Sequence, residues 1–564
     1  MQLAPDIKRR LAVLLMVLLP AGFWLLAVRS LGLAPSALKW REFGLLLRAT
    51  PESVYLYGPP LLGFIVAAIV VVIVGRRTRV DGFQGAPYRR WIRGTRTTSA
   101  SGLAAQTRQM FRKQVEIAGV PMPTKCETLH LLLVGATGSG KSAAMEPMIY
   151  SALKRGDRLF AVDPNGDLLS KFYRPGDIIL NPYDARTEGW SFFNEVRADY
   201  DWKRLALSVV PLSKDSNAEE WNDFGRLLLR ETAKKLYLMG CPSITELFRW
   251  CTLADPQDLK AFLSGTLAES LFAGSNEASK ALSSARFVLS NKLSEHVSMQ
   301  QGNFSIRDWI DDPKGGNLFI NWRADMGPAM RALVTSWVDV FQTAILSTPK
   351  GRNQRWWQSL DELPALDPLP TLPAALTMGR KHDLCILASI QATSQVADRY
   401  GQLAAQTIRA SFRNLLVLGG AITDPQTAED MSKSLGEHEV ERDEFNVSRS
   451  VRQNTTGARA ARARERVVTP AQIQSLPILE GYLAFAGNYP IAPVKVKPIN
   501  FVASTPAFVE SNLLAPLSKT SSSPGQTFAQ PPRSERPGSA QEATNHRQPS
   551  DSHSSDAPKQ MKLL

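Results

Sequence analysis

LHLLLVGATGSGKSAAMEPMIYSALK, residues 129–154, holds the strongest structural signal in this chain. A short apolar run, Leu129 to Val134, leads into a glycine-rich loop, and the pattern predicts a helix from about Lys141 to Lys154. The loop matches G-x-x-x-x-G-K-[ST], in which glycines let backbone N–H groups point at phosphates and the helix adds the positive end of its dipole. An ordinary glycine turn is the alternative, but a strand before the loop and a helix after it favour a P-loop.

Two residues of the loop have expected chemical roles. The ammonium group of Lys141 would reach the β- and γ-phosphates of a nucleoside triphosphate, and the hydroxyl of Ser142 would ligate Mg²⁺. ATP and Mg²⁺ are therefore the expected cofactors. The phosphate-binding residues are expected to be Gly135, Ala136, Thr137, Gly138, Ser139, Gly140, Lys141 and Ser142.

Strand-like and helix-like patterns alternate on both sides of the loop. RLFAV at 158–162 predicts a second strand, closed by the turn DPNGD at 163–167. Helical patterns fill 188–307, which predicts an all-α insertion. The alternation predicts an α/β fold with a parallel sheet covered on both faces. Further strands are expected at 317–322, near 360, at 384–390 and at 414–418, with a final pair at 482–486 and 494–496 forming an antiparallel edge.

A nucleotide hydrolase also needs a carboxylate for the metal and a means of activating water. Asp361 and Glu362 follow the strand near 360. We expect Asp361 to bind the metal through water and Glu362 to orient or deprotonate the attacking water, with a solvated surface pair as the alternative. Gln391 ends the strand 384–390 and is placed to sense the γ-phosphate, although a simple turn residue fits as well. Asp163 and Asn165 are interpreted as plain turn residues.

Two apolar runs near the amino end, at 11–28 and about 54–74, are each long enough to cross a hydrocarbon core as a helix. A cleaved signal peptide is the alternative for the first run. Basic residues precede the first run and follow the second, which favours a hairpin with both termini in the cytoplasm. The Arg-rich segment 76–113 is interpreted as a contact for anionic lipid head groups, with DNA binding as the alternative.

The composition narrows the class of protein. A formal net charge of +14 favours a polyanionic partner or an anionic membrane surface. The four cysteines are scattered without a CxxC pair, which disfavours a disulfide framework or a zinc site. The segment from about residue 505 is rich in Ser, Pro, Gln and Ala, and its few large apolar residues predict disorder.

The P-loop, the turn VDPNGD, the pair LDEL and the segment IQATSQ follow one another in this order. With these motifs the chain resembles the type IV coupling proteins of bacterial conjugation, most of all their TraD/TrwB branch. The similarity extends from the apolar hairpin to about residue 510. It also includes LNPYDARTEGWSFFNEVR, EEWNDFGRLLLRETAKKL and TLAESLFAGSNEASKALSSARFVLS.

The resemblance implies an architecture and a set of partners. The architecture is a RecA-like P-loop nucleotide-binding domain with an all-α insertion domain, carried by a two-helix transmembrane hairpin in the bacterial inner membrane. The family resembles ring-forming hexamers that hydrolyse ATP between subunits. The resemblance further implies a chain that pumps DNA without sequence preference and links the relaxase–DNA complex to the subunits of a type IV secretion channel.

By matching position, the resemblance gives Lys141 and Ser142 the P-loop roles and gives Asp361 and Glu362 the metal and water roles. Gln391 takes the sensor role. In MGRKHD, Arg380 matches an arginine proposed to reach the nucleotide of a neighbouring subunit, whereas the residue alone fits a surface arginine equally well. Gln358 and Ser359 stand where the family has apolar residues, so disturbed strand packing is expected there.

The expected domain boundaries are 1–80 for the membrane hairpin, 81–187 and 308–505 for the two parts of the nucleotide-binding domain, 188–307 for the all-α domain, and 506–564 for the disordered tail. Two other functions compete with DNA pumping in conjugation. A chromosome-segregating translocase shares the anchor and the motor, but such proteins generally end in a DNA-reading winged-helix domain. A membrane receptor would use ATP only to assemble.

Overall fold

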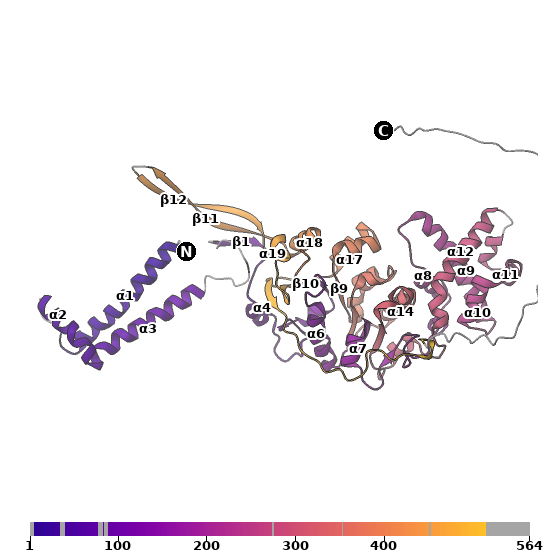
Figure 1. Cartoon of the computed structure of the whole chain (residues 1–564), viewed down its shortest axis with the longest axis horizontal. Helices are drawn as coiled ribbons and strands as arrows, with labels where there is room; N and C mark the ends of the chain where they lie inside the picture. The colour runs from indigo at the N-terminus through magenta and orange to yellow at the C-terminus, as the bar shows by residue number, and fades with distance from the viewer. Residues whose placement is uncertain are drawn as a thin grey trace, which may run out of the picture. The chain divides into compact units, whose positions relative to one another are not determined.

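The computed structural model describes residues 5–33, 40–76, 83, 88, 90–272, 276–351, 354–450 and 453–514, so most of the expected tail at 506–564 lies outside the described residues. A nine-stranded sheet with the order β14-β13-β10-β4-β9-β8-β5-β7-β6 forms the centre of the nucleotide-binding part (Figure 1). Neighbouring strands are parallel, except that β13 runs antiparallel to both β10 and β14. The predicted parallel sheet with an antiparallel edge is therefore confirmed. The strands are β4 Leu131–Val134, β5 Arg158–Pro164, β6 Ile178–Ile179, β7 Leu318–Trp322, β8 Trp356–Leu360, β9 Leu384–Ile390, β10 Asn414–Leu418, β13 Glu480–Ala484 and β14 Ala492–Lys495.

Both faces of the sheet are covered by helices, because alternate side chains of each strand pack on opposite sides. In β4, Leu131 and Leu133 join a core cluster with α6 (Lys141–Arg155) and α7 (Asp167–Phe172). Leu132 and Val134 of the same strand join a second cluster, which contains α14 (Gly327–Ser347). All four side chains are buried, so the strand is apolar throughout, as parallel strands between two helical layers are. The other helices of this part are α4 Ala100–Thr107, α5 Thr124–Glu127, α15 Leu372–Met378, α16 Thr393–Tyr400, α17 Gln402–Ser411, α18 Pro425–Leu435 and α19 Pro470–Gln474.

Helices fill the segment between β6 and β7, and the described residues of 188–307 contain no strand. Buried side chains of these helices belong to the same core cluster as α14 and one face of the sheet. The helices α8 and α13 contact α14 directly, and Figure 1 shows α8 beside α14. The α-helices of this segment are α8 Tyr200–Val209, α9 Ser216–Leu238, α10 Ile244–Phe248, α11 Pro256–Leu263, α12 Asn276–Ser298 and α13 Ile306–Asp311.

Two helices near the amino end are long and apolar enough to cross a membrane. They are α1 (Pro5–Ser30) and α3 (Val54–Arg76), and few of their described apolar side chains are buried, while many are exposed. The two helices pack on each other where α3 carries Gly63, since a Cβ there would lie 3.0 Å from the carbonyl oxygen of Leu19. A small residue at a crossing of this kind lets helix backbones approach within a membrane. A short helix, α2 (Trp40–Ala49), lies between them in sequence and was not predicted.

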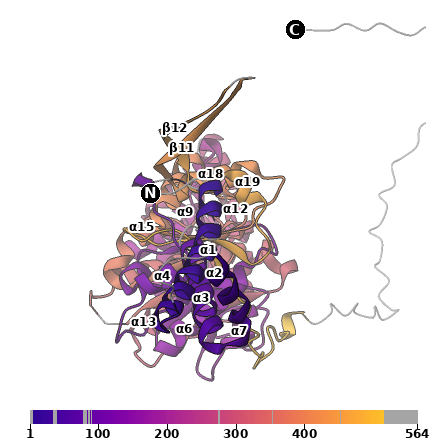
Figure 2. The same ribbon diagram turned by 90° about the vertical axis from the view of Figure 1, so that its left-hand side faces the viewer.

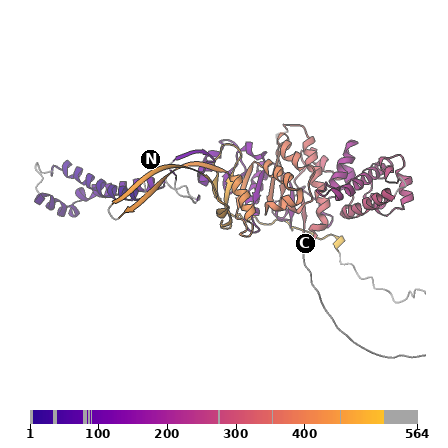
Figure 3. The same ribbon diagram turned by 90° about the horizontal axis from the view of Figure 1, so that it is seen from above.

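A second sheet, which was not predicted, has the order β1-β11-β12 (Figure 1), and Figures 2 and 3 show its long β11–β12 hairpin from two other sides. On one face, Glu439 of β11 stands in register between Arg93 of β1 and Arg464 of β12. The Arg93 guanidinium contacts the Glu439 carboxylate at 2.5 Å, so opposite charges alternate across the strands. The Arg-rich segment 76–113 thus contributes a strand and α4 to the folded protein. The strands are β1 Arg90–Gly94, β11 Glu437–Ser450 and β12 Gln453–Arg466.

Candidate nucleotide-binding site

The glycine-rich loop lies at the carboxyl edge of the sheet, between the ends of β9 and β10, the strands on either side of β4. The Gly135 amide donates a hydrogen bond to the Ile390 carbonyl at 3.2 Å, and the Ala136 amide donates to the Gly419 carbonyl at 2.9 Å. Gly138 and Gly140 adopt φ values of 76° and 105°, a region that residues with a Cβ rarely enter. The helix α6 begins immediately afterwards, so its free amide groups point towards the loop. This arrangement is a cradle for phosphate.

Lys141 begins α6 and folds back over the loop. Its ammonium group donates hydrogen bonds to the carbonyl oxygens of Gly135 at 2.7 Å and Ala136 at 3.2 Å. Burial lowers the pKa of Lys141, while the nearby carboxylates of Glu362 and Asp361 oppose that shift. The Lys141 side chain thus interacts electrostatically with both carboxylates.

Asp361 and Glu362 directly follow β8, on the same edge as the loop. Asp361 accepts a hydrogen bond from the Ser389 hydroxyl at 2.9 Å. Glu362 has a φ of 65°, which is unusual for a residue other than glycine and marks strain at a candidate functional position. Burial raises the pKa of both carboxyl groups, and the Lys141 ammonium opposes the shift in each case. A base with a raised pKa accepts a proton more readily near neutral pH.

Gln391 connects the loop to Glu362. Its side-chain amide nitrogen donates to the Glu362 carboxylate at 2.8 Å, and its carbonyl oxygen accepts from the Thr137 hydroxyl at 2.9 Å. Since Thr137 belongs to the P-loop, two hydrogen bonds to one side chain connect the phosphate cradle to Glu362. The structure thus brings the predicted residues Lys141, Asp361, Glu362 and Gln391 together.

Asp163 follows the neighbouring strand β5, and its carboxylate accepts hydrogen bonds from the amides of Leu168 at 3.1 Å and Leu169 at 2.7 Å. It therefore anchors the start of α7 across the predicted turn, in agreement with the structural interpretation. Burial raises the pKa of Asp163 to about 7, and the neighbouring carboxylates of Asp167 and Asp361 add to the shift. The carboxyl edge is consequently rich in carboxylates.

Arg380 does not join this cluster within the chain. It lies in the turn before β9 begins, whereas Gln391 follows the end of β9. A strand of seven residues is about 20 Å long, so Arg380 lies at the amino edge of the sheet. Its side chain is exposed and forms no hydrogen bond or ion pair with any described residue.

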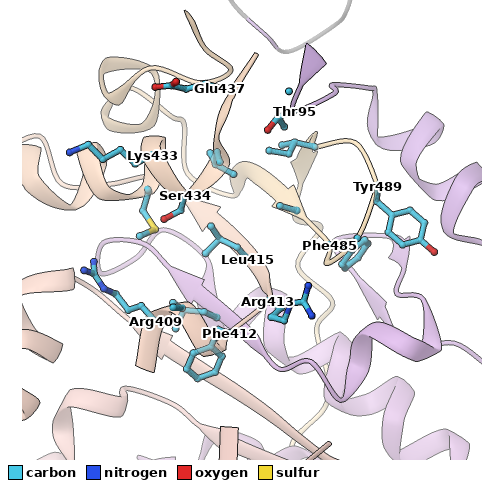
Figure 4. A pocket seen from close by; sticks show the side chains of 18 of the residues that line it. Thr95, Arg409, Phe412, Arg413, Leu415, Lys433, Ser434, Glu437, Phe485 and Tyr489 are labelled. Carbon is cyan, nitrogen blue, oxygen red and sulfur yellow. The ribbon is translucent and has the colours of Figure 1, made fainter. Parts of the chain in front are cut away.

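The amino edge also holds a groove of about 1050 Å³ at the start of β10 (Figure 4). Arg413 precedes β10, and its exposed guanidinium has no ion-pair partner among the residues that the structure describes. Arg409 in the same groove pairs with Asp430 of α18 at 2.7 Å. Phe485 and Tyr489 line the opposite side. The groove at the amino edge thus holds a cation without an ion-pair partner among the described residues and two aromatic side chains, beside the paired Arg409 and Asp430.

The strand pairing at Gln358 and Ser359 is intact, although the Gln358 amide nitrogen and the Ser359 hydroxyl have no hydrogen-bond partner among the described residues. Both side chains are buried within β8, which pairs with β5 and β9 along its whole length. The Gln342 amide nitrogen of α14 donates to the Gln358 carbonyl oxygen at 3.0 Å, which satisfies one polar atom inside the core. One site residue was missed altogether. Ser389 contacts Asp361, and a serine within an apolar strand carries no sequence signal of such a role.

The described residues include no cluster of three His, Cys, Asp or Glu side chains that could enclose a metal ion. Mg²⁺ does not require one, because it usually takes one or two protein oxygens and completes its shell with water and substrate phosphates. The exposed hydroxyl of Ser142 and the carboxylate of Asp361 fit that requirement. The residues present therefore fit Mg²⁺ shared with a bound nucleotide.

The chain is similar to known coupling proteins at the level of sequence. The family model described as the type IV secretion-system coupling protein DNA-binding domain matches residues 114–497. Coupling protein TraD of Escherichia coli strain K12 is 28% identical over 417 residues, which cover 71% of this chain and 57% of TraD. The chain therefore spans little more than half the length of that relative.

Solved structures extend the similarity to the fold. The bacterial conjugative coupling protein TrwBΔN70, in its unbound monoclinic form, is 59% identical, with a TM-score of 0.73. The match covers 76% of this chain and 99% of the TrwBΔN70 chain. TrwB in complex with ADP and Mg²⁺ is likewise 59% identical, with a TM-score of 0.72 and coverages of 76% and 100%. The predicted RecA-like nucleotide-binding fold with a helical domain is confirmed. The chain belongs to the type IV secretion-system coupling protein family.

Proposed function

We propose that this chain is the DNA-translocating ATPase of a conjugation system, which couples a relaxase–DNA complex to a type IV secretion channel. The observation that carries the proposal is the hydrogen-bonded path from the P-loop residue Thr137 through Gln391 to Glu362, beside Lys141 and Asp361. Such a path is expected where the presence of a γ-phosphate must control the activation of water. TrwB, at 59% identity, binds ADP and Mg²⁺ and supports the same ligands here.

Each residue of the site has a proposed task in hydrolysis. The loop amides and Lys141 bind the β- and γ-phosphates, while Ser142 and, through water, Asp361 hold Mg²⁺, which neutralises charge on the phosphoryl oxygens. Glu362 orients the attacking water and accepts its proton, a task suited to its raised pKa. Gln391 reports the occupancy of the loop to Glu362.

The site is completed by a second copy of the chain. Arg380 lies too far from the P-loop to reach it within one subunit, and its exposed guanidinium is free to enter a neighbour's site. A contact between the amino edge of one copy and the carboxyl edge of the next is heterologous, and such contacts form a ring when the rotation between copies closes. Cationic side chains on the first edge and carboxylates on the second make the two edges complementary in charge. A homo-hexameric ring is the proposed assembly.

The location proposed is the bacterial inner membrane, with α1 and α3 as a hairpin and both termini in the cytoplasm. The basic residues near β1 are proposed to contact anionic lipid. Within the ring, DNA would be bound through its backbone without sequence preference, so the affinity would fall steeply with salt. The domain limits given above are kept as part of this proposal.

ATP hydrolysis by the purified full-length chain, with and without DNA, tests the proposal. We expect Mg²⁺-dependent turnover that DNA stimulates, and we expect Lys141→Ala and Glu362→Gln to abolish both turnover and conjugative transfer. A receptor that uses ATP only for assembly would hydrolyse at a rate that DNA leaves unchanged, and both variants would still support transfer. A chromosome translocase would leave transfer intact while the variants impair segregation.

A further inference from the structure

A buried serine lies next to the candidate catalytic carboxylates. Ser389 is the sixth residue of the apolar strand β9 (LCILASI), and its side chain is fully buried. A hydroxyl in such a place destabilises the fold unless it is hydrogen-bonded. The Ser389 hydroxyl donates to Asp361 Oδ1 at 2.9 Å and accepts from the Glu362 amide at 3.3 Å. A single hydroxyl therefore contacts both members of the carboxylate pair.

The contact with the Glu362 amide bears on a strained backbone. Glu362 has φ 65° and ψ 67°, in the left-handed region. Three hydrogen bonds hold it there: its amide donates to Ser389, its carbonyl accepts from the Ala365 amide at 2.9 Å, and its carboxylate accepts from Gln391. Strained conformations persist only where the surroundings over-determine them. Removal of the serine hydroxyl leaves the strained amide without its partner.

The contact with Asp361 bears on the metal site. A carboxylate that binds Mg²⁺ is oriented by the groups that donate hydrogen bonds to it, and loss of such a group weakens metal binding. Ser389 reaches Asp361 from the neighbouring strand, so the orientation is set by the sheet itself. No other described residue outside the Asp361–Glu362 segment donates a side-chain hydrogen bond to Asp361.

We propose that Ser389 is a positioning residue for ATP hydrolysis, which orients Asp361 for Mg²⁺ and holds Glu362 in its left-handed conformation for the attacking water. The inference rests on the proposed function. In this proposal the Ser389 hydroxyl couples metal binding to water activation, because it positions Asp361 and Glu362 together.

The neighbouring strand offers a matched control. Ser359 of β8 is also buried, at 1% exposure, and its hydroxyl oxygen has no hydrogen-bond partner among the described residues. Ser359→Ala and Ser389→Ala remove the same atom from the same layer of the core. Only the second removes hydrogen bonds to the carboxylate pair.

The experiment measures the steady-state ATPase rate of the full-length chain with DNA while the Mg²⁺ concentration is varied. For Ser389→Ala we expect the half-saturating Mg²⁺ concentration to rise about tenfold and kcat to fall about tenfold, the lower end of losses from removing an outer-shell partner. Ser359→Ala should stay within about twofold of wild type in both quantities, since it breaks no hydrogen bond. Binding of a fluorescent ATP analogue in EDTA should be equal in all three proteins.

Two further measurements secure the interpretation. Ser389→Cys keeps a side chain of similar shape with a weaker donor, and it should shift the Mg²⁺ dependence in the same direction. In a double-mutant cycle on the half-saturating Mg²⁺ concentration, Ser389→Ala should add little to Asp361→Asn, because both act on one metal ligand. An unchanged Mg²⁺ dependence in Ser389→Ala, or additive effects in the cycle, would overturn the proposal while leaving wild-type ATPase activity intact. Absence of hydrolysis in the wild type would instead overturn the proposed function.

Discussion

The two edges of the nine-stranded sheet use their charged residues differently. At the carboxyl edge, Lys141 is held by loop carbonyls and Glu362 by Gln391. At the amino edge, Arg380, Lys381 and Arg413 are exposed and form no ion pair with any residue that the structure describes. Groups already bonded within the chain are fixed before a ligand arrives, whereas unpaired cations are available to a second molecule. The carboxyl edge is therefore arranged to bind nucleotide with groups of a single chain. The unpaired cations of the amino edge are suited to contact the site of a neighbouring copy.

The largest expected effect comes from breaking the carboxyl edge itself. Glu362→Gln removes the proposed base while keeping the shape of the side chain, so kcat should fall about 10⁴-fold with ATP binding retained. Lys141→Ala should lose ATP binding as well, whereas Lys154→Ala, on the exposed side of the same helix, should not. Titration with a fluorescent ATP analogue and steady-state kinetics measure both quantities. Near wild-type turnover in Glu362→Gln would remove this residue from the mechanism.

The amino edge is expected to show the next largest effect. Arg380→Ala should lower kcat about 10³-fold, the lower end of what an arginine supplied in trans contributes, while ATP binding stays unchanged. Lysine cannot reproduce the planar fork of donors, so Arg380→Lys should restore little activity. The adjacent exposed residue provides the control, and Lys381→Ala should be close to wild type. Equal losses at Arg380 and Lys381 would indicate a general loss of charge instead.

A smaller effect is expected from breaking the hydrogen bonds that connect the P-loop to Glu362. Gln391→Ala removes the link between the P-loop and Glu362, and Thr137→Val removes only the loop side of that link. We expect a fall in kcat of about tenfold for Gln391→Ala and less for Thr137→Val, as for the loss of positioning hydrogen bonds. Single-turnover kinetics at saturating ATP measure the step. A larger loss in Thr137→Val than in Gln391→Ala would contradict the path.

The last expected effect is on stability rather than on catalysis. The pKa of Asp163 is raised to about 7 from an ordinary value of 3.8, so the folded chain binds a proton in this interval that the unfolded chain has released. The contribution of Asp163 to stability therefore falls as the pH rises from about 4 to about 7. Thermal unfolding without Mg²⁺ should show this loss in wild type relative to Asp163→Asn. Parallel curves for the two proteins would exclude a raised pKa.

Much of the carboxyl edge could be predicted from the sequence. The P-loop was predictable because its spacing is fixed by phosphate geometry, and Asp361, Glu362 and Gln391 were found because parallel strands end on the same edge as that loop. The β11–β12 hairpin was missed, since its strands are rich in charged residues, such as Glu439 and its partner in register Arg464, and carry few large apolar ones. Ser389 was missed because its role depends on two hydrogen bonds across strands that only the folded sheet brings together.

The most direct test of a site formed by the amino edge of one copy and the carboxyl edge of the next is a mixture of two inactive variants. The Glu362→Gln variant retains Arg380, and the Arg380→Ala variant retains an intact carboxyl edge. A complete site therefore forms where Arg380 of the first variant reaches the carboxyl edge of the second. In rings assembled at random from equal amounts, about a quarter of the contacts have this order. We predict that the mixture recovers about a quarter of the wild-type DNA-stimulated ATPase rate. A mixture no more active than either variant alone would contradict the account.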